Sequence, residues 1–191
     1  TLLVGVSLRF DDRMEGTTLT SFFKDGIIDS LRIEGMAKTV YHIFEDSIYQ
    51  GKNNASGDTI ALSFYDDDLN IINIIGGSEG KYLPDSISND NDHPVVYKAN
   101  KIKYRLKHDE SDFYGNVNIR HDRTNLDAGF VNVNWKTDML DALPNVKGDT
   151  LSEPILPVIK EEGRDPMTGN AMTYNLKTRK GRVTQGQTKA D

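Results

Sequence analysis

The segment SFFKDGIIDSLRIEG, residues 21–35, recurs as SFYDDDLNIINIIGG at residues 63–77, an offset of 42 residues. In both copies apolar and polar residues alternate on either side of a short turn sequence, KDG in the first and DDD in the second. This pattern predicts two antiparallel strands joined by a tight hairpin. A repeated hairpin cannot bury its apolar face alone, so we expect the copies to stack side by side in a larger sheet.

Short alternating runs of this kind occupy most of the chain, and helical periodicity is almost absent. Strands are predicted at Thr18–Phe23, Ile27–Ile33, Thr39–Phe44, Thr59–Tyr65, Leu69–Ile75, Ile102–Leu106, Phe113–His121, Gly129–Trp135 and Met172–Leu176. Four of the six prolines lie between Leu143 and Asn170, which predicts an irregular connection there. Many strands joined by tight turns predict an all-β antiparallel sandwich, barrel or jelly-roll.

Composition narrows the possible partners. The 191 residues include 23 Lys and Arg against 29 Asp and Glu, a net charge of −6, which argues against nucleic acid or an anionic membrane surface as the main partner. The chain has no cysteine, which excludes disulfides and thiolate metal ligands. It begins at Thr1 without a leader sequence, so we expect it to be a piece of a longer protein.

Residues arranged for catalysis are not found. The four histidines do not share a metal-ligand spacing, and the glycines at 76–80 lack the Lys-Ser/Thr and the following helix of a phosphate loop. The acidic runs at 66–68 and 89–92 could supply oxygen ligands for calcium, but neither has the spacing of a calcium loop and both suit turns. The sequence therefore predicts no enzyme activity, no metal and no cofactor.

Apolar faces remain as the candidate functional feature. Alternate residues of a strand share a face, as do Ile27, Leu31 and Ile33 in one predicted strand. Such faces would arise in the closed core of any β-sandwich, so this pattern alone does not indicate a binding groove. A structural β-repeat module and a carbohydrate-binding β-sandwich, with Tyr and Trp stacking on sugars, are both compatible with it.

The region Phe22–Pro84 resembles the OstA-like proteins of diderm bacteria. Those proteins have a strand–DG–strand hairpin, a G-N-A-x-x-x-Y element and a G-x-N-x-x-x-G-D segment. Their last motif is G-x-x-G-x-x-x-P. The corresponding positions here are Gly35, Met36, Ala37, Tyr41, Gly51, Asn53, Gly57, Asp58, Gly77, Gly80 and Pro84. Met36 departs from the pattern, because the family usually has Asn there.

The region Lys101–Ala142 resembles the N-terminal periplasmic domain of LptD-like proteins, and Met172–Asp191 resembles the segment that continues it. The matching residues of the first region are Tyr104, Leu106, Gly115, Asn116, Val117, Leu126, Ala128, Val131, Asn134, Trp135, Thr137 and Ala142. The two resemblances divide the chain into an OstA-like part at 1–92 and a second OstA-like or LptD-like part at 93–191. The Pro-rich link of the second part lies at about 143–170.

The resemblance implies an antiparallel, V-shaped β-jelly-roll that works in the periplasm in lipopolysaccharide transport. Its apolar groove would shield the acyl chains of lipid A. Further modules of the same family would pair with its edge strands, and a barrel domain outside this chain would connect it to the outer membrane. The residues expected to line the groove are Leu31, Ile33, Tyr41, Ile43, Ile60, Leu62, Phe64, Ile72, Ile74, Tyr104, Leu106, Val117, Ile119, Val131, Val133 and Trp135.

Overall fold

The computed structural model describes residues 12–45, 47–85, 93–145 and 153–188. Apart from one short 3-10 helix, η1, its regular elements are antiparallel strands, so the all-β prediction is confirmed. The strands are β1 (Arg13–Glu15), β2 (Thr18–Lys24), β3 (Ile27–Glu45), β4 (Ile48–Tyr65), β5 (Asp68–Pro84), β6 (Val95–Arg105), β7 (Glu110–His121), β8 (Thr124–Asn134), β9 (Met139–Leu143), β10 (Val158–Glu161), β11 (Met167–Thr168), β12 (Ala171–Asn175), β13 (Lys180–Thr184) and β14 (Gln187–Thr188), with η1 at Leu106–His108.

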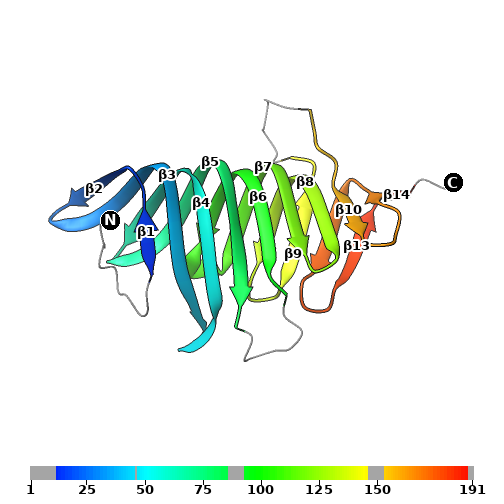
Figure 1. Ribbon diagram of the computed structural model, residues 1–191, viewed down its shortest axis with the longest axis horizontal. Coiled ribbons are helices and arrows are strands. Elements are labelled where there is room, and N and C mark those ends of the chain that lie inside the picture. Colours follow the sequence, from blue (N-terminus) through cyan, green and yellow to red (C-terminus); the bar gives the residue numbers. More distant parts are fainter. Residues whose placement is uncertain (1–11, 46, 86–92, 146–152, 189–191) are drawn as a thin grey trace.

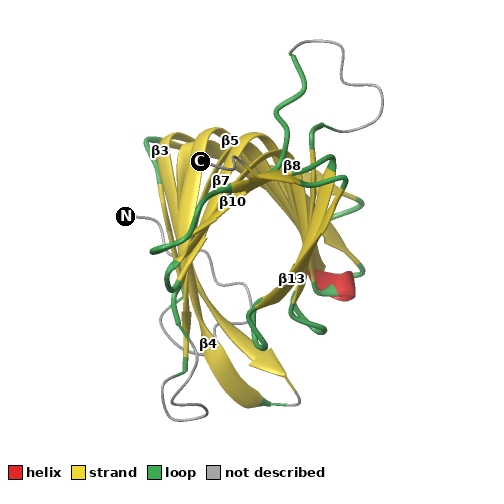
Figure 2. Cartoon of the chain, turned by 90° about the vertical axis from the view of Figure 1, so that its right-hand side faces the viewer, coloured by secondary structure: helices red, strands yellow, loops and turns green. Residues whose placement is uncertain are grey.

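All of these strands belong to one sheet, which is folded lengthwise into two walls (Figures 1 and 2). Wall A runs in the order β2, β3, β4, β5, β6, β7, β8, β9, β12, β13. Wall B runs in the order β1, β3, β4, β5, β6, β7, β8, β10, β11, β14. The six strands β3 to β8 pass through both walls. In end view the walls form an arch that is open on the side away from the fold line (Figure 2).

A row of β-bulges makes the fold line, which we call the crease. In each pairing of neighbours from β3 to β8, the odd-numbered strand has one residue more than the even-numbered strand at this level. The extra residues belong to the pairs Gly35-Met36, Gly76-Gly77 and Gly115-Asn116, all six with positive φ. Bulges of this kind bend a strand and increase its twist, which turns each strand from one wall into the other.

The crease explains where the predicted strands were too short. Sequence alternation predicted separate strands at Ile27–Ile33 and Thr39–Phe44, whereas β3 runs unbroken through both. In β4 the inward positions shift from Ala55 to Ile60, an odd step, so a period of two does not continue across the crease. The glycines that looked like strand ends are therefore bends within strands.

The repeated hairpin is present, but its true offset is 41 residues. Phe23 pairs with Ile28 in the first hairpin, and Phe64 pairs with Leu69 in the second. Gly35 is the first residue of the bulge that follows the first hairpin, and Gly76 is the first residue of the bulge that follows the second. The predicted offset of 42 paired Ile33 with Ile75, yet the side chain of Ile75 points outward and is 43% exposed.

A further bulge near the tip of the first hairpin places the side chain of Ile27 on the outer face of the sheet, as that of Ile75 is, with 51% of it exposed. The prediction that Ile27 shares the face of Leu31 and Ile33 was therefore wrong. Both hairpin turns, Asp25-Gly26 and Asp66-Asp67, have two residues with positive φ, as the twist of a two-residue hairpin requires.

The sheet continues across the predicted boundary at residues 92–93, because β5 pairs with β6 from Ile71↔Arg105 to Tyr82↔Val95. Two short strands lie in the described part of the segment 143–170, for which an irregular Pro-rich link was predicted. They are β10 and β11, which extend wall B, and Ile159 of β10 packs against the core. The acidic run at 89–92 lies outside the described residues.

We predict that Gly76, the first residue of its bulge, tolerates a side chain less well than Gly77, the second. A Cβ at Gly76 would lie 2.2–2.9 Å from the side chain of Asp58, whereas a Cβ at Gly77 meets nothing within 4 Å. Gly76→Asn should lower the free energy of unfolding by about 1–3 kcal/mol more than Gly77→Asn, because only the first substitution overpacks. Urea denaturation of the two variants measures the difference, and equal costs would contradict the role given to Gly76.

Candidate binding site between the walls

All 16 residues predicted to line a groove lie on the inner face, between the two walls. Eleven of them are at most 3% exposed: Leu31, Ile33, Ile60, Leu62, Ile72, Ile74, Tyr104, Val117, Ile119, Val131 and Val133. The other five are half-buried: Tyr41, Ile43, Phe64, Leu106 and Trp135. Contact of these side chains with a lipid stays a prediction.

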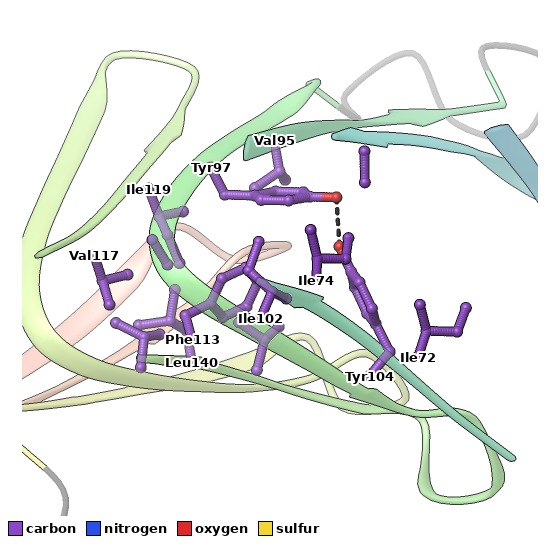
Figure 3. Close-up of a cluster of buried hydrophobic side chains, with 14 of the residues drawn as sticks. Ile72, Ile74, Val95, Tyr97, Ile102, Tyr104, Phe113, Val117, Ile119 and Leu140 are labelled. Atoms are coloured by element: carbon purple, nitrogen blue, oxygen red, sulfur yellow. Dashed lines mark hydrogen bonds between the residues drawn. The ribbon is translucent and has the colours of Figure 1, made fainter. Parts of the chain in front are cut away.

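The inner face is packed, with side chains from the two walls in contact across the space between them (Figure 3). The ring of Tyr97, on wall B, meets the ring of Phe113, on wall A, edge to face with centroids 5.2 Å apart. Both residues are fully buried. A ligand that enters between the walls must therefore displace existing contacts.

Small side chains line the inner face beside the crease. The buried alanines there are Ala37, Ala55, Ala99, Ala128 and Ala142. Larger buried side chains also adjoin the crease, among them Ile33, Ile74 and Ile102, so small and large residues pack together there. Sequence reasoning missed these alanines, because an alanine within a polar run does not raise the alternation signal.

A polar cluster interrupts the apolar inner face. Tyr41, Asn53 and Tyr97 reach it from wall B, and Tyr104 reaches it from wall A (Figure 3 shows the tyrosine pair). The Asn53 amide nitrogen donates to the hydroxyls of Tyr41, at 3.2 Å, and Tyr104, at 3.3 Å. The Tyr97 hydroxyl donates to the Asn53 amide oxygen at 2.6 Å and lies 2.6 Å from the Tyr104 hydroxyl.

One assignment of the hydroxyl protons gives every hydrogen bond among Asn53, Tyr97 and Tyr104 both a donor and an acceptor. Because the Tyr97 proton goes to Asn53, the Tyr104 hydroxyl must be the donor in the bond between the two tyrosines. Burial raises the pKa of Tyr41 to about 12 and raises the pKa values of Tyr97 and Tyr104 further above the usual 10.0. The three hydroxyls therefore stay protonated, and the cluster is neutral.

At the open side of the arch, a hollow of about 390 Å³ lies between the tips of the walls; we call it the mouth. Apolar and aromatic side chains from both walls line it: Ile43, Phe44, Tyr82, Val95, Trp135 and Leu176. Charged and polar groups also line it: Gln50, Asp85, His93, Asp109, His121, Lys136, Asp138 and Lys177.

Two aromatic residues span the mouth. The rings of Tyr82, on wall B, and Trp135, just after the wall A part of β8, lie 5.6 Å apart. The Trp135 indole donates to the Ser111 hydroxyl at 2.7 Å, and the Tyr82 hydroxyl donates to the Gln50 carbonyl at 3.0 Å. Two of the predicted residues, Ile43 and Trp135, belong to the mouth; Tyr82 and Val95 were missed, because β5 and β6 were predicted to be shorter than they are.

A second hollow, of about 450 Å³, lies on the outer face of wall B. Long charged side chains surround it, including the pairs Arg13–Glu15, at 2.9 Å, and Lys98–Glu79, at 3.3 Å. We interpret it as a gap in a solvated charged surface. Within the described residues, no cluster of His, Asp or Glu is arranged to hold a metal ion, and no helix is long and apolar enough to cross a membrane.

No protein-family model and no curated protein matches this sequence. Among solved structures, the fold is similar to that of LptH from Pseudomonas aeruginosa, described as the LptA homologous periplasmic component of the conserved lipopolysaccharide transport device. The TM-score is 0.62 at 12% identity, over 80% of this chain and 95% of that one. At this identity the similarity establishes the fold, an LptA-like β-jelly-roll, and confirms that prediction. The LptD-like resemblance stays a prediction.

Removing one hydroxyl from the polar cluster should destabilise the protein. Tyr97→Phe leaves the amide oxygen of buried Asn53 without its donor, and a buried unsatisfied polar group costs about 1–3 kcal/mol. Tyr65→Phe is the matched control, because Tyr65 is 62% exposed at a hairpin tip and should change stability by less than about 0.5 kcal/mol. Equal denaturation midpoints for the two variants would contradict the importance of the cluster.

The same cluster predicts loss of stability in alkali. A tyrosine whose pKa is raised by folding contributes stability that is complete below the unfolded value of 10.0 and is lost as pH rises through the folded value, about 12 for Tyr41. Urea midpoints should therefore fall steadily as pH rises above 10, and three of the eight tyrosines should ionise only on unfolding. Full ionisation of all eight in the folded protein, followed by phenolate absorbance, would refute this.

Proposed function

We propose that this chain is a periplasmic module of lipopolysaccharide transport that shields the acyl chains of lipid A between its two walls and catalyses no reaction. The observation that carries the proposal is the inner face. Apart from the polar cluster, this face is apolar on both walls, and it opens along one side at the mouth. The fold of the chain is similar to that of LptH.

The energetics suit an acyl ligand. Each Å² of apolar surface removed from water contributes about 25 cal/mol, so a hydrocarbon chain between the walls is favoured. The inner face is already packed, so binding exchanges contacts between walls for contacts with the ligand. Between β3 and β8 the walls are joined through the crease, and the strand ends at the mouth are the parts farthest from this connection, so the walls can move apart there.

The ends of the sheet suit strand pairing with further modules. β1 and β2 form one end and β13 and β14 the other, each paired on one side among the described strands (Figure 1). Phe23 on β2 occupies the position that Phe64 has in the next hairpin, but it is 67% exposed, because β2 has no further strand beside it among the described residues. A neighbouring jelly-roll that adds strands there would cover it. The outer-membrane barrel implied by the resemblance is proposed as the destination of the lipid.

Photo-crosslinking tests the proposal. A photoreactive residue at Leu62 or Val133, on the inner face, should crosslink to lipopolysaccharide incubated with the purified protein, whereas one at Ile75 should not. Ile75 is the matched control, because it follows the buried Ile74 on the same strand and points outward.

Crosslinking at no inner position would refute the lipid-conduit proposal and would favour a structural β-repeat. Binding of a lipid-free polysaccharide together with absence of inner crosslinks would favour the carbohydrate-binding alternative. Equal crosslinking at Leu62 and Ile75 would show adsorption to the surface rather than shielding.

A further inference from the structure

The polar cluster lies one inward step deeper than the mouth. On β3, the next inward residue from Ile43 is Tyr41, and on β6 the next from Val95 is Tyr97. Two residues of a strand span roughly 6.6–6.8 Å. A chain that enters between the walls from the mouth therefore meets the cluster before it reaches the apolar residues beside the crease.

The backbone of β5 leaves room for this cluster. Gly80 stands opposite Tyr97, and a Cβ there would lie 2.3 Å from the Tyr97 hydroxyl and 2.6 Å from the carbonyl oxygen of Asn54. The absence of a side chain at position 80 thus lets the Tyr97 ring reach Asn53 and Tyr104. The cluster depends on this exact fit of one strand against the next.

The cluster also joins the walls. Tyr104 is the member from wall A, and it is held by the Tyr97 hydroxyl and the Asn53 amide from wall B. Moving the walls apart at this level breaks both bonds and leaves buried polar groups, each at a cost of about 1–3 kcal/mol unless a new partner is supplied. A plain hydrocarbon supplies none. A chain that has a hydroxyl or an amide at this depth can both donate and accept.

From this geometry we infer that the cluster of Tyr41, Asn53, Tyr97 and Tyr104 selects the ligand class: acyl chains with a hydroxyl or amide group near the head, in preference to unsubstituted chains. The inference rests on the proposed function and deepens it. Its head group would remain at the mouth, which both cationic side chains, Lys136 and Lys177, and anionic side chains, Asp85, Asp109 and Asp138, line. Below the cluster, the apolar remainder of the chain would contact Ile74 and Ile102.

Binding of two fatty acids tests the inference. The probes are tetradecanoic acid and the same acid with a hydroxyl on its β-carbon, both below their micelle concentrations. Trp135, the single tryptophan of the chain, lies in the mouth and reports occupancy by fluorescence. The wild-type protein should bind the hydroxylated acid about fivefold to tenfold more tightly, the value of one net hydrogen bond. Equal affinities in the wild type would overturn the inference and leave the proposed function standing.

An apolar variant provides the matched control. Asn53→Leu combined with Tyr41→Phe, Tyr97→Phe and Tyr104→Phe removes all four polar side chains of the cluster together, and this variant should bind both acids with equal affinity. A preference that persists in this variant would overturn the inference. If neither acid bound the wild-type protein, both the inference and the proposed function would be overturned.

A third probe keeps the test independent of the variant's folding. The same acid hydroxylated at its terminal carbon places its hydroxyl far beyond the cluster. The wild-type protein should bind it no more tightly than tetradecanoic acid. A preference for this probe equal to that for the β-hydroxylated acid would show that hydroxyl position is irrelevant and would overturn the inference.

Discussion

The structure depends on one backbone constraint, the extra residue that β3, β5 and β7 each have at the crease. Because that residue is accommodated at positive φ, and glycine comes first in each pair, the strand bends without losing its partners on either side. The bends align across six neighbouring strands and fold a single sheet on itself. Without them the same strands would form one broad sheet with an uncovered apolar face.

The crease also determines which side chains meet. In β3, β5 and β7 the inward residues keep an even spacing through the bend, as Ile33 and Ala37 do. In β4, β6 and β8 the spacing becomes odd, as between Ala99 and Ile102. Both halves of every strand can therefore direct apolar residues inward, so a single sheet supplies two facing walls.

The interior that results combines a packed apolar face with a neutral polar cluster, and this combination bears on function. Under the proposed function the walls part for a ligand, and the hydrogen bonds of the cluster would then restore one closed arrangement. Buried hydrogen bonds are directional, and the Tyr97–Tyr104 contact holds the walls at one spacing. The mouth, lined by Tyr82 and Trp135, lies where the two walls are farthest from the crease and least constrained by it.

Much of this could be predicted from residues that are neighbours in sequence. Alternation, turn residues and the recurring hairpin determined that the chain is all-β and antiparallel. They also predicted apolar faces that contain Leu62 and Val133, and both side chains are buried between the walls. The sequence could not show that Gly35 and Gly76 bend strands rather than end them, because a bulge is defined by the residue count of the partner strand. The sequence also could not show that Asn53 contacts Tyr104, which lies 51 residues away. That contact exists only because β4 and β6 flank β5 and the crease turns the two walls to face each other.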